Sequence, residues 1–290
     1  MNTILAPLRR YPLAAGIILM FALTWPIDLA YGGRLPFRVP FALYLFLGWG
    51  IVVATLFMTW VTAGRAGVVV LLRRFLIWRV GWRWYAVALG LYPALFLGAL
   101  GLNAVRTGAP VAFDQTLAVR FFGQSAGLLL FVVPFFLFEA IANGEEIGWR
   151  GFVLPRVLAR HSALVAALIV GVIWGAWHLP KYVNPFDGVA FGLVMVKAAG
   201  DSVLFTWLYN NTRGSLLLAV LFHAAGNTAG FFLLPAPDVA GREPLMALIA
   251  GLVVLVAAAV TLAFGPERLS RAENARTSRT DAGDVHRSML

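Results

Sequence analysis

The sequence predicts an all-α membrane protein, a polytopic bundle of about eight transmembrane helices. Hydrophobic residues make up 61% of its 290 positions and charged residues only 12%, whereas about a quarter of the residues in a typical soluble domain are charged. Apolar runs of roughly 20 residues, the length of a membrane-spanning helix, recur along the chain. We therefore expect residues 1–265 to form one integral domain in the lipid bilayer of the cell membrane.

Eight apolar segments are long enough to be predicted as spans. The first follows Arg9 and Arg10, as in a signal peptide, but it is too long and lacks a small-residue cleavage site around Trp25. We expect it to remain as an uncleaved anchor. In order along the chain, the predicted spans are residues 12–29, 41–61, 84–102, 123–141, 164–179, 189–209, 215–234 and 244–264.

The distribution of basic residues predicts the orientation of this bundle. Eight spans place both termini on one side, and most of the 23 Lys and Arg residues fall at the N-terminus, in the loops of that side and in the C-terminal tail. Lys and Arg are enriched in cytoplasmic loops, so both termini are expected in the cytoplasm. The net charge of +10 then reflects topology. Because the sequence contains no DNA- or RNA-binding motif, we expect no nucleic-acid partner.

Two further segments lie outside the predicted spans. Residues 65–83 mix five arginines with Val, Leu, Phe and Trp, which suits a helix lying in the cytoplasmic interface; the alternative is a solvated loop. After Gly265 and Pro266 the chain becomes polar and poor in aromatic residues. This composition predicts a disordered cytoplasmic tail over residues 266–290.

Polar residues that can do chemistry occur at three places in or beside the apolar segments. At the first, Glu145 and Glu146 follow an apolar run, and Arg150 comes four residues after Glu146. Helical residues four apart share a face, so an ion pair between Glu146 and Arg150 is expected. Glu145 would be turned about 100° away, toward the bundle centre, and left free as a base. Ordinary charges at a helix end are the alternative, and Glu139 is either a further buried acid or points outward.

The other two places each carry a histidine. Trp174 and His178 lie one turn apart at the end of the fifth predicted span, and Pro180 then breaks the helix. His223 and Asn227 share a helical face in the seventh span, where imidazole and amide groups can donate to an oxyanion. Taken singly, His178 can be a structural residue, and His223 with Asn227 an interhelical clamp. Ionisable groups within the membrane nevertheless usually mark a functional site.

The order of these three motifs resembles that of the CPBP (Abi) family of intramembrane proteases, which includes the type II CAAX prenyl endopeptidases. The matching residues, motif by motif, are Glu145-Glu146 with Arg150, Trp174 with His178, and His223 with Asn227. The resemblance covers about residues 124–235, which we expect to be the protease core. Trp174 departs from the family, which usually has Phe there, so an aromatic wall is kept while the size of the pocket beside His178 can differ.

The resemblance implies an endopeptidase with a water-filled chamber inside the helix bundle. Glu145 and His178 would activate the hydrolytic water. His223 and Asn227 would hold the tetrahedral oxyanion. The residues expected to support this catalytic set are Glu146, Arg150 and Trp174. The partner would be a peptide or protein substrate, of the CAAX type or otherwise prenylated or membrane-anchored, cut near the cytoplasmic membrane surface.

The residues leave open whether a metal takes part. Two histidines and a carboxylate can bind Zn²⁺ or another divalent ion with one position open for water, and Glu145, His178 and His223 are such a set. The same groups can also act without a metal, with Glu145 as the base and the imidazoles as donors. The usual helical zinc signature, His-Glu-x-x-His, is absent from the sequence, which also contains no cysteine.

Two other functions remain open at this point. One is a non-enzymatic protein of the same fold, acting in bacteriocin immunity or as a scaffold. The other is a proton-coupled transporter that uses Glu145, Glu146 and His178 as a relay. The paired broken helices that are typical of many transporters are not evident in the sequence.

Overall fold

The computed structural model of the protein describes residues 5–111, 113–124, 126–183, 189–237, 239 and 241–271. Within these ranges the chain is helical and has no β-strand, apart from one isolated bridge between Thr116 and Pro235. The prediction of an all-α, polytopic helix bundle is confirmed.

Long helices alternate with short ones. The longer helices are α2 (Pro12–Tyr31), α4 (Trp49–Arg73), α5 (Trp82–Thr107), α7 (Val132–Ala142), α10 (Ala163–Trp177), α12 (Phe191–Asn211), α13 (Leu216–Leu233) and α14 (Arg242–Phe264). The short α-helices are α1 (Ala6–Arg10), α3 (Phe41–Tyr44), α6 (Leu117–Phe122), α8 (Glu145–Gly148), α9 (Leu154–Leu158) and α11 (Leu179–Val183). Three 3₁₀ turns, η1 (Arg74–Leu76), η2 (Phe113–Gln115) and η3 (Ala126–Phe131), and one π-helical turn, η4 (Trp149–Val153), complete the described part.

Six helices of the described part are long and apolar enough to cross a membrane: α2, α4 together with η1, α5, α12, α13 and α14. A seventh span results if the bent pair Gly127–Ala142 and Glu145–Leu158 counts as one. The remaining predicted span, 164–179, corresponds to α10, which has 15 residues and is shorter than a typical span. The predicted count of eight is therefore not confirmed.

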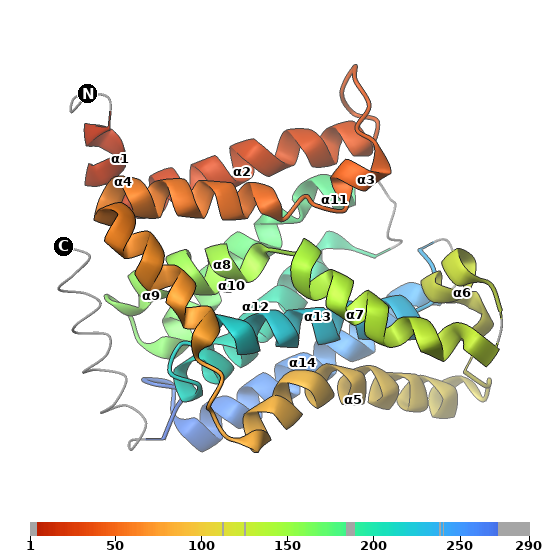
Figure 1. The fold of residues 1–290 in the computed structure, drawn as a ribbon. Helices are drawn as coiled ribbons and strands as arrows, with labels where there is room; N and C mark the ends of the chain where they lie inside the picture. The colour runs from red at the N-terminus through yellow and green to blue at the C-terminus, as the bar shows by residue number, and fades with distance from the viewer. Residues whose placement is uncertain are drawn as a thin grey trace.

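The helices are arranged in layers (Figure 1). α2 and α4 lie together on one side, α5 and α14 on the opposite side, and α12 and α13 run between them. α10 packs on α12, while α13 contacts α5, α7 and α8. The elements that carry the three motifs are therefore neighbours in the middle of the bundle.

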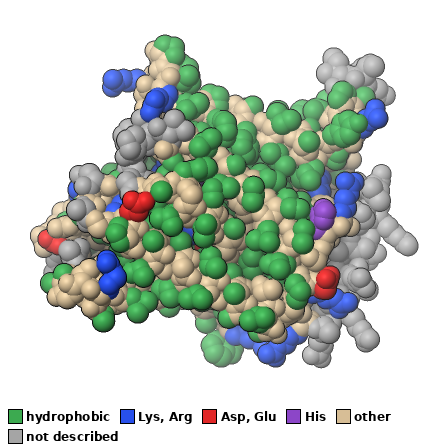
Figure 2. Space-filling model, turned by 180° about the vertical axis from the view of Figure 1, so that it is seen from behind, with side chains coloured by type: hydrophobic (Ala, Val, Ile, Leu, Met, Phe, Trp, Pro, Cys, Tyr) green, Lys and Arg blue, Asp and Glu red, His purple; other side chains and the backbone are tan. Residues whose placement is uncertain are grey.

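The outer surface of the bundle is apolar. Figure 2 shows hydrophobic side chains over the middle of one face, with most charged side chains near its ends. Large hydrophobic side chains that are more than half exposed occur on six of the longer helices, for example at Ile18, Val53, Leu97, Val133, Val172 and Leu255. Such a surface is compatible with contact to lipid, because the hydrogen-bonding groups of the backbone are satisfied within the helices.

The arginine-rich segment 65–83 begins with a helical stretch that is separated from the rest of α4 by a kink, and it ends at the start of α5. Gly64 has φ +63°, a conformation that glycine adopts without strain, and it kinks α4 before Arg65. The chain stays helical through η1 and then becomes irregular. Arg74 in η1 donates to the carbonyl oxygen of Gly151 over 3.2 Å and to the hydroxyl of Tyr209. An interfacial position for the segment beyond Gly64 stays a prediction.

The chain breaks between α7 and α8, just after the end of the fourth predicted span. Gly144 has φ +66° and precedes Glu145, so the two glutamates begin a new helix instead of ending one. The new helix, α8, packs tightly on α4, because a Cβ added to Gly148 would lie 2.2 Å from Cγ2 of Ile51. A π-helical turn, a feature often found at functional sites, follows at Trp149–Val153.

The first part of the predicted disordered tail is packed on the bundle, so a tail starting at 266 is wrong for residues 266–271. The backbone N–H groups of Ala163 and Leu164, at the start of α10, donate to the carbonyls of Glu267 and Pro266 over 3.0 and 2.9 Å. A helix start needs such acceptors, and Leu269 is fully buried. The predicted disorder of residues 272–290 lies outside the described residues.

Candidate active site

Glu145 is buried at the start of α8, where two indole groups hold one of its carboxylate oxygens. Nε1 of Trp174 donates to Oε2 over 2.7 Å, and Nε1 of Trp149 donates to the same oxygen over 3.1 Å. Charge-assisted hydrogen bonds of this kind stabilise a carboxylate away from water. The prediction that Glu145 is left free is therefore wrong for Oε2, while Oε1 accepts a longer hydrogen bond, from Nδ2 of Asn143 over 3.3 Å.

Glu146 joins the first motif to the third. Its Oε1 accepts hydrogen bonds from Nη1 of Arg150 over 3.0 Å and from Nδ1 of His223 over 2.7 Å. The Glu146 and Arg150 side chains are fully buried, so the predicted ion pair is confirmed. Arg150 also lies over the ring of Phe205, with its Cζ 4.0 Å from the centroid. These contacts leave Nε2 of His223 3.9 Å from Oε1 of Glu145.

Asn143, in the break before α8, fixes the tautomer of His223. Its Oδ1 accepts from the backbone N–H of Glu145 over 3.1 Å, so its Nδ2 is the atom that faces Nε2 of His223 at 3.1 Å. An amide nitrogen only donates, so Nε2 is the acceptor and the ring proton sits on Nδ1. This proton is donated to Glu146. His223 is therefore neutral in this arrangement, with its Nε2 lone pair toward Asn143 and Glu145.

His178 lies just beyond the end of α10, beside Trp174. Its Nδ1 donates to the carbonyl oxygen of Trp174 over 2.9 Å, and the two rings are 5.9 Å apart between centroids. Nε2 therefore carries the lone pair in the neutral ring. Glu145 interacts electrostatically with both His178 and His223. The second motif thus contributes Trp174, which donates a hydrogen bond to Glu145, and His178, which lies beside Trp174.

Asn227 contacts Glu139 and not the carboxylate of Glu145. Its side chain is exposed, and its Nδ2 donates to Oε2 of Glu139 over 2.8 Å. Glu139 is half-buried and interacts electrostatically with His223 and Glu145. Asn227 and Glu139 therefore form a polar pair at the edge of the cluster.

The three motifs meet inside the bundle, where α13 contacts α8 and α12, and α12 contacts α10. α9 and α10 are neighbours joined by residues 159–162. Arg150 is fully buried in the bundle.

Three residues of the cluster were not among the predicted site residues: Asn143, Trp149 and Phe205. Asn143 has a signal in the sequence, because it is an amide directly after an apolar run and two residues before Glu145. Trp149 lies one helical turn after Glu145 and could have been found from that spacing. Phe205 gives no such signal, since its contact with Arg150 depends on how α12 packs.

Glu145, His178 and His223 do not form the predicted metal-binding set. Both ring nitrogens of His223 are used, and Nδ1 of His178 is bound to a carbonyl oxygen. Within the described ranges, no group of three or more His, Asp or Glu side chains is placed to hold a metal ion. We therefore assign no metal to this site.

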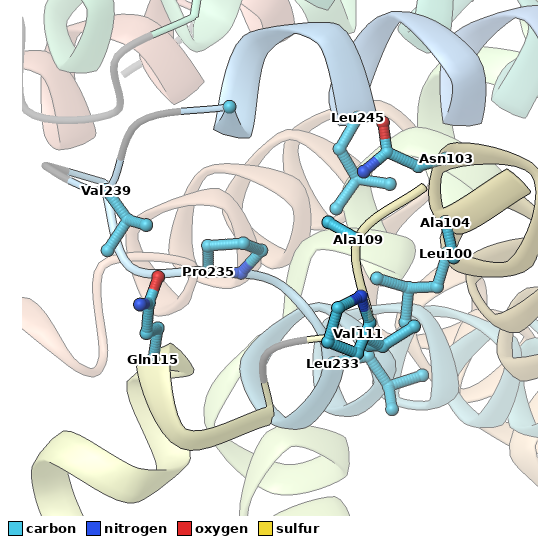
Figure 3. A pocket seen from close by; sticks show the side chains of 12 residues that line it. Leu100, Asn103, Ala104, Ala109, Val111, Gln115, Leu233, Pro235, Val239 and Leu245 are labelled. Carbon is cyan, nitrogen blue, oxygen red and sulfur yellow. The ribbon is translucent and has the colours of Figure 1, made fainter. Parts of the chain in front are cut away.

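Two cavities of the described part lie away from this cluster. One, of about 120 Å³, lies near the C-terminal end of α5 and the start of α14, and its polar side chains are Asn103 and Gln115 (Figure 3). Asn103 already accepts a hydrogen bond from Arg106. This cavity contains no acid or imidazole and is not suited to hydrolysis. The other lies at the opposite end of α5.

Comparison with known proteins gives a match over the segment that carries the three motifs. Residues 125–229 match the sequence model of a family described as "Type II CAAX prenyl endopeptidase Rce1-like". All three motifs fall within this range. The resemblance to this family is confirmed.

One curated relative extends this result. The protein named "CAAX prenyl protease 2" of Methanococcus maripaludis is 30% identical over 141 residues, which are 46% of this chain and 50% of the relative. The chain therefore spans about half the length of the curated relative it matches.

Proposed function

We propose that this protein is an intramembrane endopeptidase in which Glu145 activates water for attack on a peptide bond. The observation that carries the proposal is the convergence of three motifs on Glu145, a buried carboxylate held by Trp174 and placed 3.9 Å from His223. A buried acid beside a neutral imidazole is suited to general acid–base catalysis. The match of residues 125–229 to a family of endopeptidases supports the same reaction.

The hydrogen bonds suggest how the carboxylate works. Because Oε2 is held by two indoles, a water would bind to Oε1, with Nε2 of His178 as a second acceptor. Glu145 takes a proton from this water while the water oxygen bonds to the carbonyl carbon, and the carbonyl electron pair moves to its oxygen. Glu145 then returns the proton to the amide nitrogen as the carbon–nitrogen bond breaks. Both products leave without any change of oxidation state.

Two groups are proposed to stabilise the oxyanion. The amide of Asn227 can donate whatever the protonation state of its neighbours. Its hydrogen bond would move from Glu139 to the substrate oxygen. His223 can donate from Nε2 only when its ring is protonated, and the neighbouring Glu146 favours that charge. Glu146 and Arg150 hold His223 in place through their shared contact.

The proposed substrate is a peptide with a prenylated cysteine near its C-terminus. The name of the curated relative supports this class, and a lipid-modified peptide would be concentrated at the membrane in which the bundle lies. The non-enzymatic and transporter alternatives remain outcomes of the test.

The test is cleavage by the purified protein in liposomes. We expect hydrolysis of a farnesylated CAAX peptide and slower or no hydrolysis of the same peptide without the farnesyl group. Because the donors do not fit a metal, turnover should be unchanged after verified metal removal by a chelator. A folded protein that cuts neither this peptide nor a broad peptide library would favour the non-enzymatic alternative. Substrate-driven proton flux without cleavage would favour a transporter.

A further inference from the structure

A cavity of about 220 Å³ lies at the end of the bundle where α5 begins and α12 and α14 end. Trp84, Trp207 and Phe264 line it. Their rings meet edge to face, with centroids 5.2 Å apart for Trp84 and Trp207 and 5.5 Å apart for Trp207 and Phe264. The cavity therefore has an aromatic wall built from three transmembrane helices.

Two guanidinium groups also line this cavity. Cζ of Arg83 lies 5.6 Å from the ring centroid of Trp84, and Cζ of Arg271 lies 5.7 Å from that of Phe264. Both side chains are exposed, and neither forms an ion pair with a carboxylate in the described part of the chain. Two unpaired guanidinium groups at one cavity favour an anion, and phosphate oxygens match the fork of arginine donors.

The structure holds the second arginine in place through its backbone. Nδ2 of Asn211 donates to the carbonyl oxygens of Trp207 and Leu269, each over 2.8 Å. Nδ2 of Asn210 donates to the carbonyl oxygen of Arg268 over 2.7 Å. The segment that leads to Arg271 is thus fixed to the end of α12.

One donor beside the cavity has no partner. Trp207 is only 9% exposed, and its indole N–H makes no hydrogen bond within the described residues. A buried donor without an acceptor costs free energy. After a small side-chain shift, an oxygen of a bound anion could serve as this acceptor.

The cavity also lies at a suitable depth for a lipid. α5, α12 and α14 are each long enough to span a bilayer, so their ends lie near the headgroups, where Trp and Arg are favoured. We propose that this cavity binds the phosphate-bearing headgroup of an anionic phospholipid, with Arg83 and Arg271 contacting the phosphate. This site is independent of the proposed peptidase activity.

Native mass spectrometry of the full chain in neutral detergent tests the proposal, with phosphatidylglycerol as the probe. Arg83→Gln together with Arg271→Gln should weaken binding of one lipid by about 30-fold, since each basic residue near a membrane contributes roughly fivefold. The matched control is Arg65→Gln with Arg73→Gln, which removes the same charge from exposed positions outside the cavity. The control should bind the lipid as the unaltered protein does.

Three results would overturn the proposal. Equal weakening in both double variants would mean that the lipid senses only the surface charge. Equal binding of phosphatidylcholine would show that the site does not select an anionic headgroup. Displacement of the lipid by millimolar glycerol phosphate would make the cavity a site for free phosphate compounds. Melting temperatures of both variants, measured without lipid, check that each remains folded.

Discussion

At the scale of single residues, Trp174 gives this site a hydrogen bond that phenylalanine cannot make. We expect Trp174→Phe to lower kcat about tenfold or more, with little change in KM, because Oε2 of Glu145 loses its 2.7 Å donor. A hydrogen bond to a charged group contributes about 1.5–3 kcal/mol, and about 1.4 kcal/mol corresponds to tenfold in rate. Steady-state kinetics on a cleaved peptide measures both constants.

Trp177 provides a matched control on the same helix. It is buried to a similar extent, and its indole also donates over 2.7 Å, but the acceptor is Thr24. Trp177→Phe should therefore cost stability comparable to that lost in Trp174→Phe while leaving kcat nearly unchanged. Similar kcat values for the two variants would show that Trp174 acts only through packing.

Glu146 and Arg150 should matter for stability as well as activity. Each is fully buried, and Nε and Nη2 of Arg150 already have no hydrogen-bond partner among the described residues. Removing one member of a buried pair strands the charge of the other, so Glu146→Ala or Arg150→Ala should lower the free energy of unfolding by about 3–5 kcal/mol. Thermal or denaturant unfolding in detergent measures this loss. Variants as stable as the unaltered protein would mean that water reaches the pair.

At the scale of helices, the close approach of α8 to α4 depends on Gly148. Gly148→Ala should destabilise the fold by about 1–3 kcal/mol, because the added Cβ would lie 2.2 Å from Ile51. Gly101, in the C-terminal part of α5, has open space around the same added atom, so Gly101→Ala is the control and should not destabilise. Melting temperatures of the two variants compare them directly, and equal losses would contradict this packing.

The limits of several helices could be predicted because an apolar run of fixed length determines them. The start at Pro12 and the end at Phe264 agree with the prediction, and α12 and α13 differ from it by few residues. The break at Gly144 could not be predicted, since its positive φ and its contact with α4 depend on the tertiary structure. For the same reason the sequence could not show that the two glutamates begin a new helix.

In the candidate site, too, contacts within one helix could be predicted from the sequence and contacts between helices could not. The pairing of Glu146 with Arg150 follows from local helical spacing and was predicted correctly. The contacts of Glu145 with Trp174, and of His223 with Asn143, join different helices and required the fold. Spacing within one helix therefore predicts partners, but it does not show which side chains of other helices they meet.

At the scale of the whole molecule, the orientation in the membrane remains a prediction that the lack of cysteine makes simple to test. Arg65 lies just beyond the kink of α4 and Arg106 near the far end of α5; both are exposed. In intact cells, an impermeant maleimide should label Arg106→Cys but not Arg65→Cys, which should react only after lysis. The opposite pattern would place both termini outside the cytoplasm.

The central claim is that Glu145 activates the hydrolytic water within the bundle. The most direct measurement is the cleavage rate of the variant Glu145→Gln in liposomes, together with its melting temperature. Glutamine keeps the shape of the side chain and an oxygen for the indole donors, but it cannot take a proton from water. We predict an intact fold and a loss of turnover of at least about 10²–10⁴-fold, the usual contribution of a general base. A folded variant that cleaves peptide at the original rate would contradict the account.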